Sequence, residues 1–218
     1  MSKRPPNIFI FMSDQEQAQV VKKGHPCKTP TAEKLASEGI LFDRCYTPTA
    51  HSCPARAVFF TGTYPSINKV YNNVCNEQKI HGSYDPTLVH FSQSLRAAGY
   101  NLGLTGKWHC SDCEWPRDRG WEEVKPTATP NVYMGQKIAG WYDEARNNPI
   151  KPGPRNRGEI FMKGYMRRKL YGVSDQPMEK RHDYQVVTQA IEAVERYVKE
   201  GKPFCIHCGP SDPHDPYI

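Results

Sequence analysis

The sequence lacks a long hydrophobic run. The longest one near its start, Ile8–Met12, is far shorter than the roughly 20 apolar residues that cross a bilayer, so we expect no membrane contact. The basic segment Met1–Pro6 is not followed by the apolar stretch and small-residue cleavage site of a secretory signal. We therefore expect a cytoplasmic protein, or a periplasmic one if a signal has been removed.

Internal repeats are absent as well, and no single charge dominates. Hydrophobic residues make up 38% of the 218 residues, which excludes a wholly disordered, collagen-like or coiled-coil chain. The net charge of +6 is mild and favours an anionic ligand over nucleic acid, which usually requires a concentrated basic face. The eight cysteines do not form a dense disulfide framework, and free thiols are expected.

Predicted strands and helices alternate along the chain, which indicates an α/β fold with a largely parallel sheet. Strands are expected over 7–12, 40–42, 101–105 and 204–208, and helices over 30–38, 54–60, 86–98 and 183–200. The last of these helices carries a continuous apolar stripe and ends at Gly201. Residues 125–182 are rich in proline, glycine and basic side chains, and they predict a long irregular segment.

Four polar residues follow the ends of predicted strands, where ligands gather in parallel α/β sheets. They are Asp14, Lys107, His109 and His214. The carboxylate of Asp14 suits a hard divalent cation, although a lone aspartate is also a common turn residue. In an extended segment Lys107 and His109 share one face while Trp108 enters the core, so an oxyanion-binding lysine would lie beside a proton donor or acceptor. The alternative is a surface lysine next to a core histidine.

Ser52 lies at the start of a predicted helix, with Pro54 in the first turn and Arg56 four residues later on the same face. The backbone N–H groups and the dipole at a helix start attract anions, and an arginine one turn along would bind the same group. A small nucleophile in this setting suits an anionic ester. The alternative is a serine that only caps the helix.

Two other patterns point to different functions. The pairs Cys110/Cys113 and Cys205/Cys208 could form a four-thiolate zinc site, but residues three apart in a strand face opposite ways, which favours buried thiols. The basic stretch Lys151–Lys169 could bind nucleic acid, and a solvated loop is the simpler interpretation.

The run from Ala50 to Gly62 resembles the (Cys/Ser)-x-Pro-x-Arg…Thr-Gly motif of the type I sulfatases, a family in the alkaline phosphatase superfamily. Three further segments are similar to its other motifs: Asn7–Gln15, Gly99–His109 and Pro213–Tyr217. The resemblance implies an α/β, alkaline-phosphatase-like sandwich with a central, largely parallel sheet flanked by helices. Residues 1–218 would be its N-terminal part, incomplete at the C-terminus, with a substrate-specificity insertion at 125–182.

The resemblance also implies a mechanism. Ser52 would be oxidised to Cα-formylglycine, whose hydrate attacks the sulfur of a sulfate ester. A serine at this position resembles the class matured by a radical iron–sulfur enzyme, often in anaerobic bacteria. Arg56 would hold the hydroxyls of the hydrate. Lys107 and His214 would bind the sulfate oxygens, and His109 would orient the hydrate and assist release of sulfate.

A metal site is implied by the same resemblance. Asp14 and the modified Ser52 would bind Ca²⁺, or else Mg²⁺ or Mn²⁺. Gln15 stands where the family usually has a second aspartate, so its role as a ligand is left open. The family's remaining metal ligands and a further lysine lie beyond the Pro-His motif, so we expect the 218-residue chain alone to be incomplete and inactive.

Three functional hypotheses follow. The leading one is a sulfatase acting on a small sulfated substrate, with no nucleic-acid or membrane partner. A phosphonate or phosphate ester hydrolase of the same superfamily is the alternative enzyme. An inactive anion- or nucleic-acid-binding fragment that uses Lys151–Lys169 is the alternative from another class, and salt-dependent binding would support it.

Overall fold

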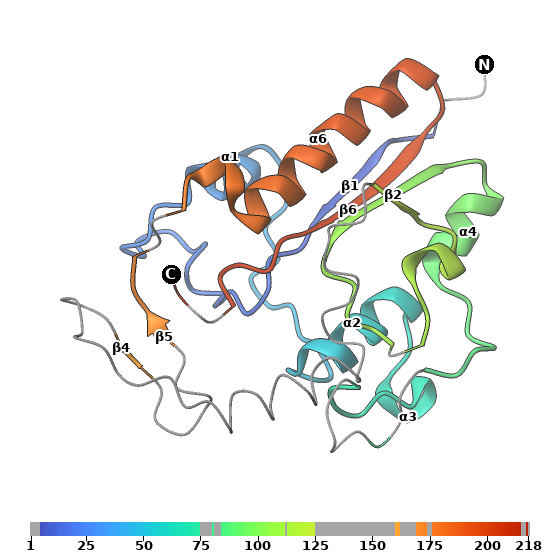
Figure 1. Ribbon diagram of the computed structural model, residues 1–218, viewed down its shortest axis with the longest axis horizontal. Coiled ribbons are helices and arrows are strands. Elements are labelled where there is room, and N and C mark those ends of the chain that lie inside the picture. Colours follow the sequence, from blue (N-terminus) through green and yellow to red (C-terminus); the bar gives the residue numbers. More distant parts are fainter. Residues whose placement is uncertain are drawn as a thin grey trace.

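The computed structural model describes residues 5–74, 80, 84–111, 113–124, 160–161, 169–173, 176–214 and 217. At its centre lies a four-stranded sheet of order β1-β6-β2-β3, in which every neighbouring pair is parallel (Figure 1). Its strands are β1 (Ile8–Phe11), β2 (Asn101–Gly106), β3 (Glu122–Glu123) and β6 (Phe204–Gly209). The expected α/β fold with a parallel central sheet is confirmed.

Helices cover both faces of this sheet (Figure 1). The long helix α6 (His182–Glu200) packs on one face, against Phe204 and Ile206 of β6. Helices α2 (Ser52–Thr61) and α4 (Phe91–Ala97) lie on the other face, where Phe60 packs with Leu104. The remaining elements of the described residues are α1 (Pro30–Glu38), α3 (Pro65–Asn68), the 3₁₀ turns η1 (Pro116–Arg119) and η2 (Met178–Lys180), and the antiparallel pair β4 (Ile160–Phe161) and β5 (Lys169–Tyr171).

Strand β6 is buried along its whole length and sends alternate side chains to the two faces. Cys205 packs in the cluster beneath α2, whereas Cys208 packs beneath α6. The two thiols therefore face opposite ways, as the strand pattern predicts, and they act as small apolar groups in two separate cores.

Three predicted elements differ from the structure. Residues Ile40–Phe42 form no strand, and their side chains are 54–81% exposed, because in the described part of the chain no strand pairs with them. The helix expected over 86–98 is shorter, since Asp85 binds the N–H of Thr87 in a turn and α4 begins only at Phe91. Strand β1 is present, but it lies at the edge of the sheet and leaves Phe9 and Phe11 more than half exposed.

The predicted insertion at 125–182, with the basic stretch Lys151–Lys169, falls mostly outside the described residues. Within the described part of the chain, no helix combines the length and the apolar character needed to cross a membrane.

Candidate active site

The carboxyl ends of β1, β2 and β6 meet at one edge of the sheet, and a cavity of about 890 Å³ opens there. Most of the residues singled out from the sequence line it: Asp14, Gln15, Ser52, Arg56 and His214. Lys107 and His109, which follow β2, join the same site through contacts with Asp14 and Ser52. The site therefore lies where a parallel α/β sheet usually binds its ligands.

Ser52 is the first residue of α2, and His51 occupies the N-cap position before it. The hydroxyl of Ser52 lies 3.0 Å from Nδ1 of His109. A serine whose only role is to cap the helix would occupy the N-cap and bind a backbone N–H group, so that alternative is wrong. The hydroxyl of Ser52 instead lies at the cavity wall, next to the positive end of the α2 dipole.

His109 is buried, and its backbone has a φ of 52°, which non-glycine residues seldom adopt. The segment is therefore not extended through His109, although Trp108 enters the core as expected. Burial, reinforced by the nearby charges of Lys107 and Arg56, lowers the pKa of His109 to about 3. The imidazole is neutral at pH 7, and one ring nitrogen can accept a proton.

Asp14 forms the centre of a buried ionic cluster. Its Oδ2 contacts Nζ of Lys107 and lies 3.5 Å from Nη2 of Arg56, and the Lys107 and Arg56 side chains are 7% and 4% exposed. Arg56 also donates from Nη1 to the carbonyl of Lys107, at 2.8 Å. Burial opposes ionisation of Asp14, but Lys107, Arg56 and His214 outweigh it and lower its pKa. Lys107 is therefore not a surface lysine, and the cluster keeps an excess of positive charge.

The two residues at the outer side of the site are less enclosed. His214 follows β6 and lines the cavity. Gln15 is exposed, with a φ of 62°, and its Nε2 donates to the hydroxyl of Tyr217 at 3.4 Å. A left-handed glutamine beside the cavity is a costly local arrangement of the kind that collects at functional sites.

The donor atoms suit a hard cation by their chemistry. Asp14, Gln15 and Ser52 all offer oxygen, the ligand type of Ca²⁺ and Mg²⁺, whereas Ca²⁺ takes about 6–8 oxygens. Among the described residues, no group of three or more His, Cys, Asp or Glu side chains is arranged to hold a metal. These residues therefore fit the cation in kind and would supply part of its coordination shell.

One contact at the site has no counterpart in the sequence analysis. The side-chain Oδ1 of Asn73 accepts the N–H of Cys53 at 3.3 Å, so a distant loop satisfies an amide in the first turn of α2. Asn73 also lines the cavity, together with Tyr46 and Phe59. No local pattern marks Asn73, because the contact joins segments 20 residues apart.

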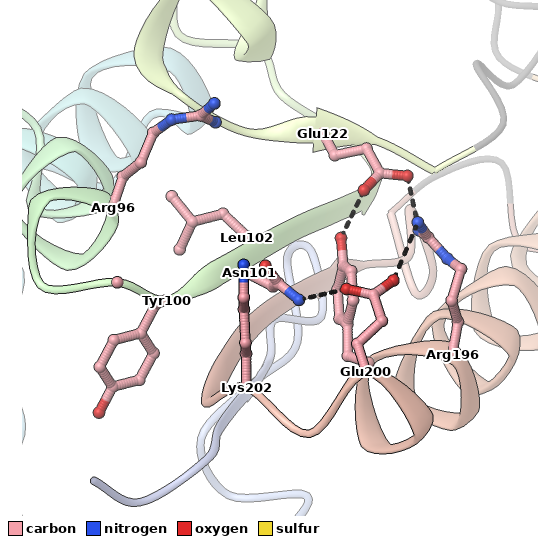
Figure 2. Close-up of a pocket in the computed structure, with 10 residues that line it drawn as sticks. Arg96, Tyr100, Asn101, Leu102, Glu122, Arg196, Glu200 and Lys202 are labelled. Atoms are coloured by element: carbon pink, nitrogen blue, oxygen red, sulfur yellow. Dashed lines mark hydrogen bonds and ion pairs between the residues drawn. The ribbon is translucent and has the colours of Figure 1, made fainter.

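A second cavity, of about 420 Å³, lies at the opposite end of the sheet, where β2 begins (Figure 2). Three of its charged groups, Glu122, Arg196 and Glu200, are engaged with one another. Glu122 of β3 pairs with Arg196 of α6 at 2.5 Å and accepts the hydroxyl of Tyr197 at 2.7 Å. Asn101 donates to Glu200 at 2.6 Å. This network ties β2 and β3 to α6 and is best explained as a structural support.

Comparisons with known proteins agree with the geometry. A sequence profile of the sulfatase family matches residues 6–218. The choline-sulfatase of Rhizobium meliloti is 29% identical over 231 residues, an alignment that covers 100% of this chain and 40% of the relative. A Bacteroides fragilis structure assigned as a sulfatase matches with a TM-score of 0.62 and 26% identity, over 98% of this chain and 45% of that one. The phosphonate monoester hydrolase of Agrobacterium radiobacter shares the fold, with a TM-score of 0.61 and 22% identity over 96% of this chain and 41% of that one. The chain thus spans less than half the length of these relatives.

Proposed function

Because the chain belongs to the sulfatase family, we propose that it carries catalytic residues of a sulfuric ester hydrolase that acts on a small sulfated substrate. The observation that carries this proposal is Ser52 at the start of α2, hydrogen-bonded to His109 and adjoining a cavity beside two buried cations. A hydroxyl, a neutral imidazole and fixed positive charge are the groups that an anionic ester requires for cleavage.

The cations would bind the sulfate group. Lys107 and His214 would contact the sulfate oxygens, on which negative charge accumulates as the ester bond breaks. Because Lys107 and Arg56 are held in place by burial and by Asp14, they need no reorganisation to meet that charge. This fixed arrangement favours binding of the transition state over binding of the substrate in its ground state.

Ser52 would be the residue that a radical iron–sulfur maturase oxidises to formylglycine, and the hydrate of that aldehyde supplies an oxygen nucleophile for sulfur. Arg56 would hold the hydroxyl groups at this position in register, since it lies on the same face of α2. His109 lies within hydrogen-bond distance of the side-chain oxygen at position 52. It would accept the proton that a hydroxyl group at this position loses when sulfate is released.

Asp14, the oxygen at position 52 and Gln15 would hold a divalent cation, Ca²⁺ or else Mg²⁺ or Mn²⁺. When bound, the cation adds positive charge next to the sulfate oxygens. The role of Asp14 is then to hold both the cation and the ammonium group of Lys107.

A phosphonate or phosphate ester hydrolase is the second candidate, because the same buried cations suit any tetrahedral anion. At neutral pH the sulfate and phosphonate monoesters are monoanions and the phosphate monoester is largely a dianion, so substrates that share one leaving group but differ in the central atom separate the two functions. Hydrolysis of 4-nitrophenyl sulfate well above that of 4-nitrophenyl phosphate and of 4-nitrophenyl phenylphosphonate supports a sulfatase.

The decisive experiment is peptide mapping by mass spectrometry on the full-length protein, made with and without a radical iron–sulfur maturase. Loss of two hydrogens on the peptide that bears Ser52, together with the appearance of sulfatase activity, is the expected result. The Ser52→Ala variant should show neither. An unmodified Ser52 in a protein that hydrolyses sulfate esters would contradict the proposed nucleophile, and modification without hydrolysis of any of the three esters would contradict the proposed reaction.

A further inference from the structure

Asp183, in the first turn of α6, binds the loop that follows β6. Its Oδ1 accepts the N–H of Ser211 at 2.8 Å, and its Oδ2 accepts the N–H of Asp212 at 2.5 Å. The side chain is 17% exposed, so both bonds are partly shielded from water. Hydrogen bonds from N–H groups to a carboxylate are stronger than those between neutral groups. The negative charge also lies at the positive end of the α6 dipole.

The loop that Asp183 binds is connected to two residues of the candidate active site. The carbonyl of Ser211 accepts the N–H of His214 at 3.0 Å, and the carbonyl of Asp212 accepts the N–H of Asp14 at 3.3 Å. The peptide group between Ser211 and Asp212 therefore donates to Asp183 on one side and accepts from His214 on the other. Such linked hydrogen bonds strengthen one another.

We infer that Asp183 is a positioning residue that sets His214 and Asp14 relative to each other. It lies in α6, outside the set of side chains that line the cavity, and acts through the backbone of the loop. Its carboxylate fixes two consecutive amides, so the loop cannot rotate without breaking both bonds. The inference rests on the proposed function, because that function gives His214 and Asp14 their roles toward sulfate and the cation.

The test compares three variants of the full-length protein. Asp183→Ala removes both acceptors, Asp183→Asn keeps the shape and one acceptor oxygen, and Glu195→Gln removes one exposed negative charge from the same helix. The first readout is the backbone amide resonances of Asp14 and His214 in the ligand-free protein. We expect both to shift in the two Asp183 variants and to stay in place in Glu195→Gln.

The second readout is the dissociation constant of inorganic sulfate, followed through the ring resonances of His214. We expect it to rise about 10–100-fold in Asp183→Ala, the effect usual for groups that orient ligating residues, with Asp183→Asn between this variant and the wild type. A residue that only stabilises α6 would lower the melting temperature without changing sulfate affinity in the folded protein.

Two results separate failure of the inference from failure of the proposed function. If the amide resonances of Asp14 and His214 are the same in Asp183→Ala as in the wild type, the positioning role is wrong whatever the protein binds. If those resonances shift but sulfate affinity in Asp183→Ala equals that of Glu195→Gln, the role in anion binding is wrong. If the wild type itself neither binds sulfate nor hydrolyses its esters, the proposed function fails, while the amide resonances still decide whether Asp183 holds the loop.

Discussion

The hydroxyl of Ser52 and the Nδ1 atom of His109 lie 3.0 Å apart, although 57 residues separate them in the sequence. Ser52 begins α2 on one face of the sheet, and His109 follows the carboxyl end of β2. The contact therefore depends on how α2 packs against the segment that follows β2, through Phe60 and Trp108, whose ring centroids are 4.6 Å apart. Packing between a helix and this segment thus sets the geometry of the two groups proposed to carry the reaction.

Replacement of His109 by glutamine should lower the turnover number of the matured enzyme by about 10²–10⁴-fold, the usual contribution of a proton-transfer group. The Michaelis constant should change much less, because other residues would bind the sulfate group. Steady-state kinetics on an aryl sulfate checks this split, with the exposed His25→Gln as a control. A rise in the Michaelis constant at unchanged turnover would mean that His109 binds substrate and transfers no proton.

Replacement of Asp14 by alanine should destabilise the cation-free protein by about 3–5 kcal/mol, because it leaves the buried charges of Lys107 and Arg56 without their carboxylate. The matched control is Asp43→Ala, which breaks the exposed pair with Lys22 and should cost far less, because water screens that pair. Urea unfolding measures both. Equal losses in the two variants would show that the Asp14 cluster contributes no more than a surface pair.

Removal of divalent cations by a chelator should lower the activity of the matured enzyme, and Ca²⁺ should restore it. Asp14→Asn should need a higher Ca²⁺ concentration for half-maximal activity, since an amide oxygen is a weaker ligand than a carboxylate. A titration of activity against free Ca²⁺ gives the two midpoints. Coincident midpoints would remove Asp14 from the ligand set.

The stability of the fold should fall in mild acid because of three buried histidines, His109 of the candidate site and two others. Burial is the main cause that lowers the pKa of His207 to about 3 and that of His90 to about 4. All three groups are charged more easily in the unfolded chain, whose histidines titrate near pH 6.5, so stability is complete above that pH and is lost as the pH falls toward the folded-state values. Each histidine should remove about 1.4 kcal/mol per pH unit in that window.

His207 lies among aromatic rings, with the centroid of Phe60 at 5.2 Å, and so His207→Phe keeps the character of the site. Between about pH 6 and 4, the unfolding free energy of this variant should fall less steeply with decreasing pH than that of the wild type. The difference between the two slopes is the contribution of one histidine. The comparison uses the slopes, so a constant packing penalty does not affect it. Parallel slopes for the wild type and the variant would refute the assignment.

Gly106, the last residue of β2, should not tolerate a side chain. Its φ is 81°, and an added Cβ would lie 2.2 Å from the carbonyl oxygen of Gly209 in β6. Gly106→Ala should therefore cost about 2–4 kcal/mol from strain and overpacking. Gly99→Ala is the control, since its φ is 88° but nothing lies within 4 Å of the added atom, and it should cost about 1 kcal/mol. Thermal unfolding of the two variants distinguishes the cost of the Cβ clash from the cost of a positive φ alone.

The sequence was sufficient to predict the features that depend on local pattern. Gly62 ends α2, and Arg56 lies on the same helical face as Ser52, because a helix fixes spacings of four residues. Alternation along β6 likewise predicts the opposite directions of Cys205 and Cys208.

Features that depend on contacts between distant segments could not be predicted in this way. The apolar run Ile40–Phe42 has the composition of a buried strand, but the described sheet offers it no partner. The bonds from Asp183 to the loop after β6 and from Asn73 to α2 likewise join separate elements. The left-handed backbone of Gln15 and His109 has no signal either, since neither residue is one that favours it as glycine does.

The strand order has a consequence for how the chain folds while it is being synthesised. The strands β1 and β2 are both made before β6, yet each pairs with β6 and neither pairs with the other (Figure 1). During synthesis on the ribosome, β1 therefore remains unpaired until residues 204–209 have emerged. A nascent chain that bears an unpaired apolar strand for this interval is exposed to aggregation, so the yield of folded protein should depend on elongation rate and on chaperones that bind the strand during translation.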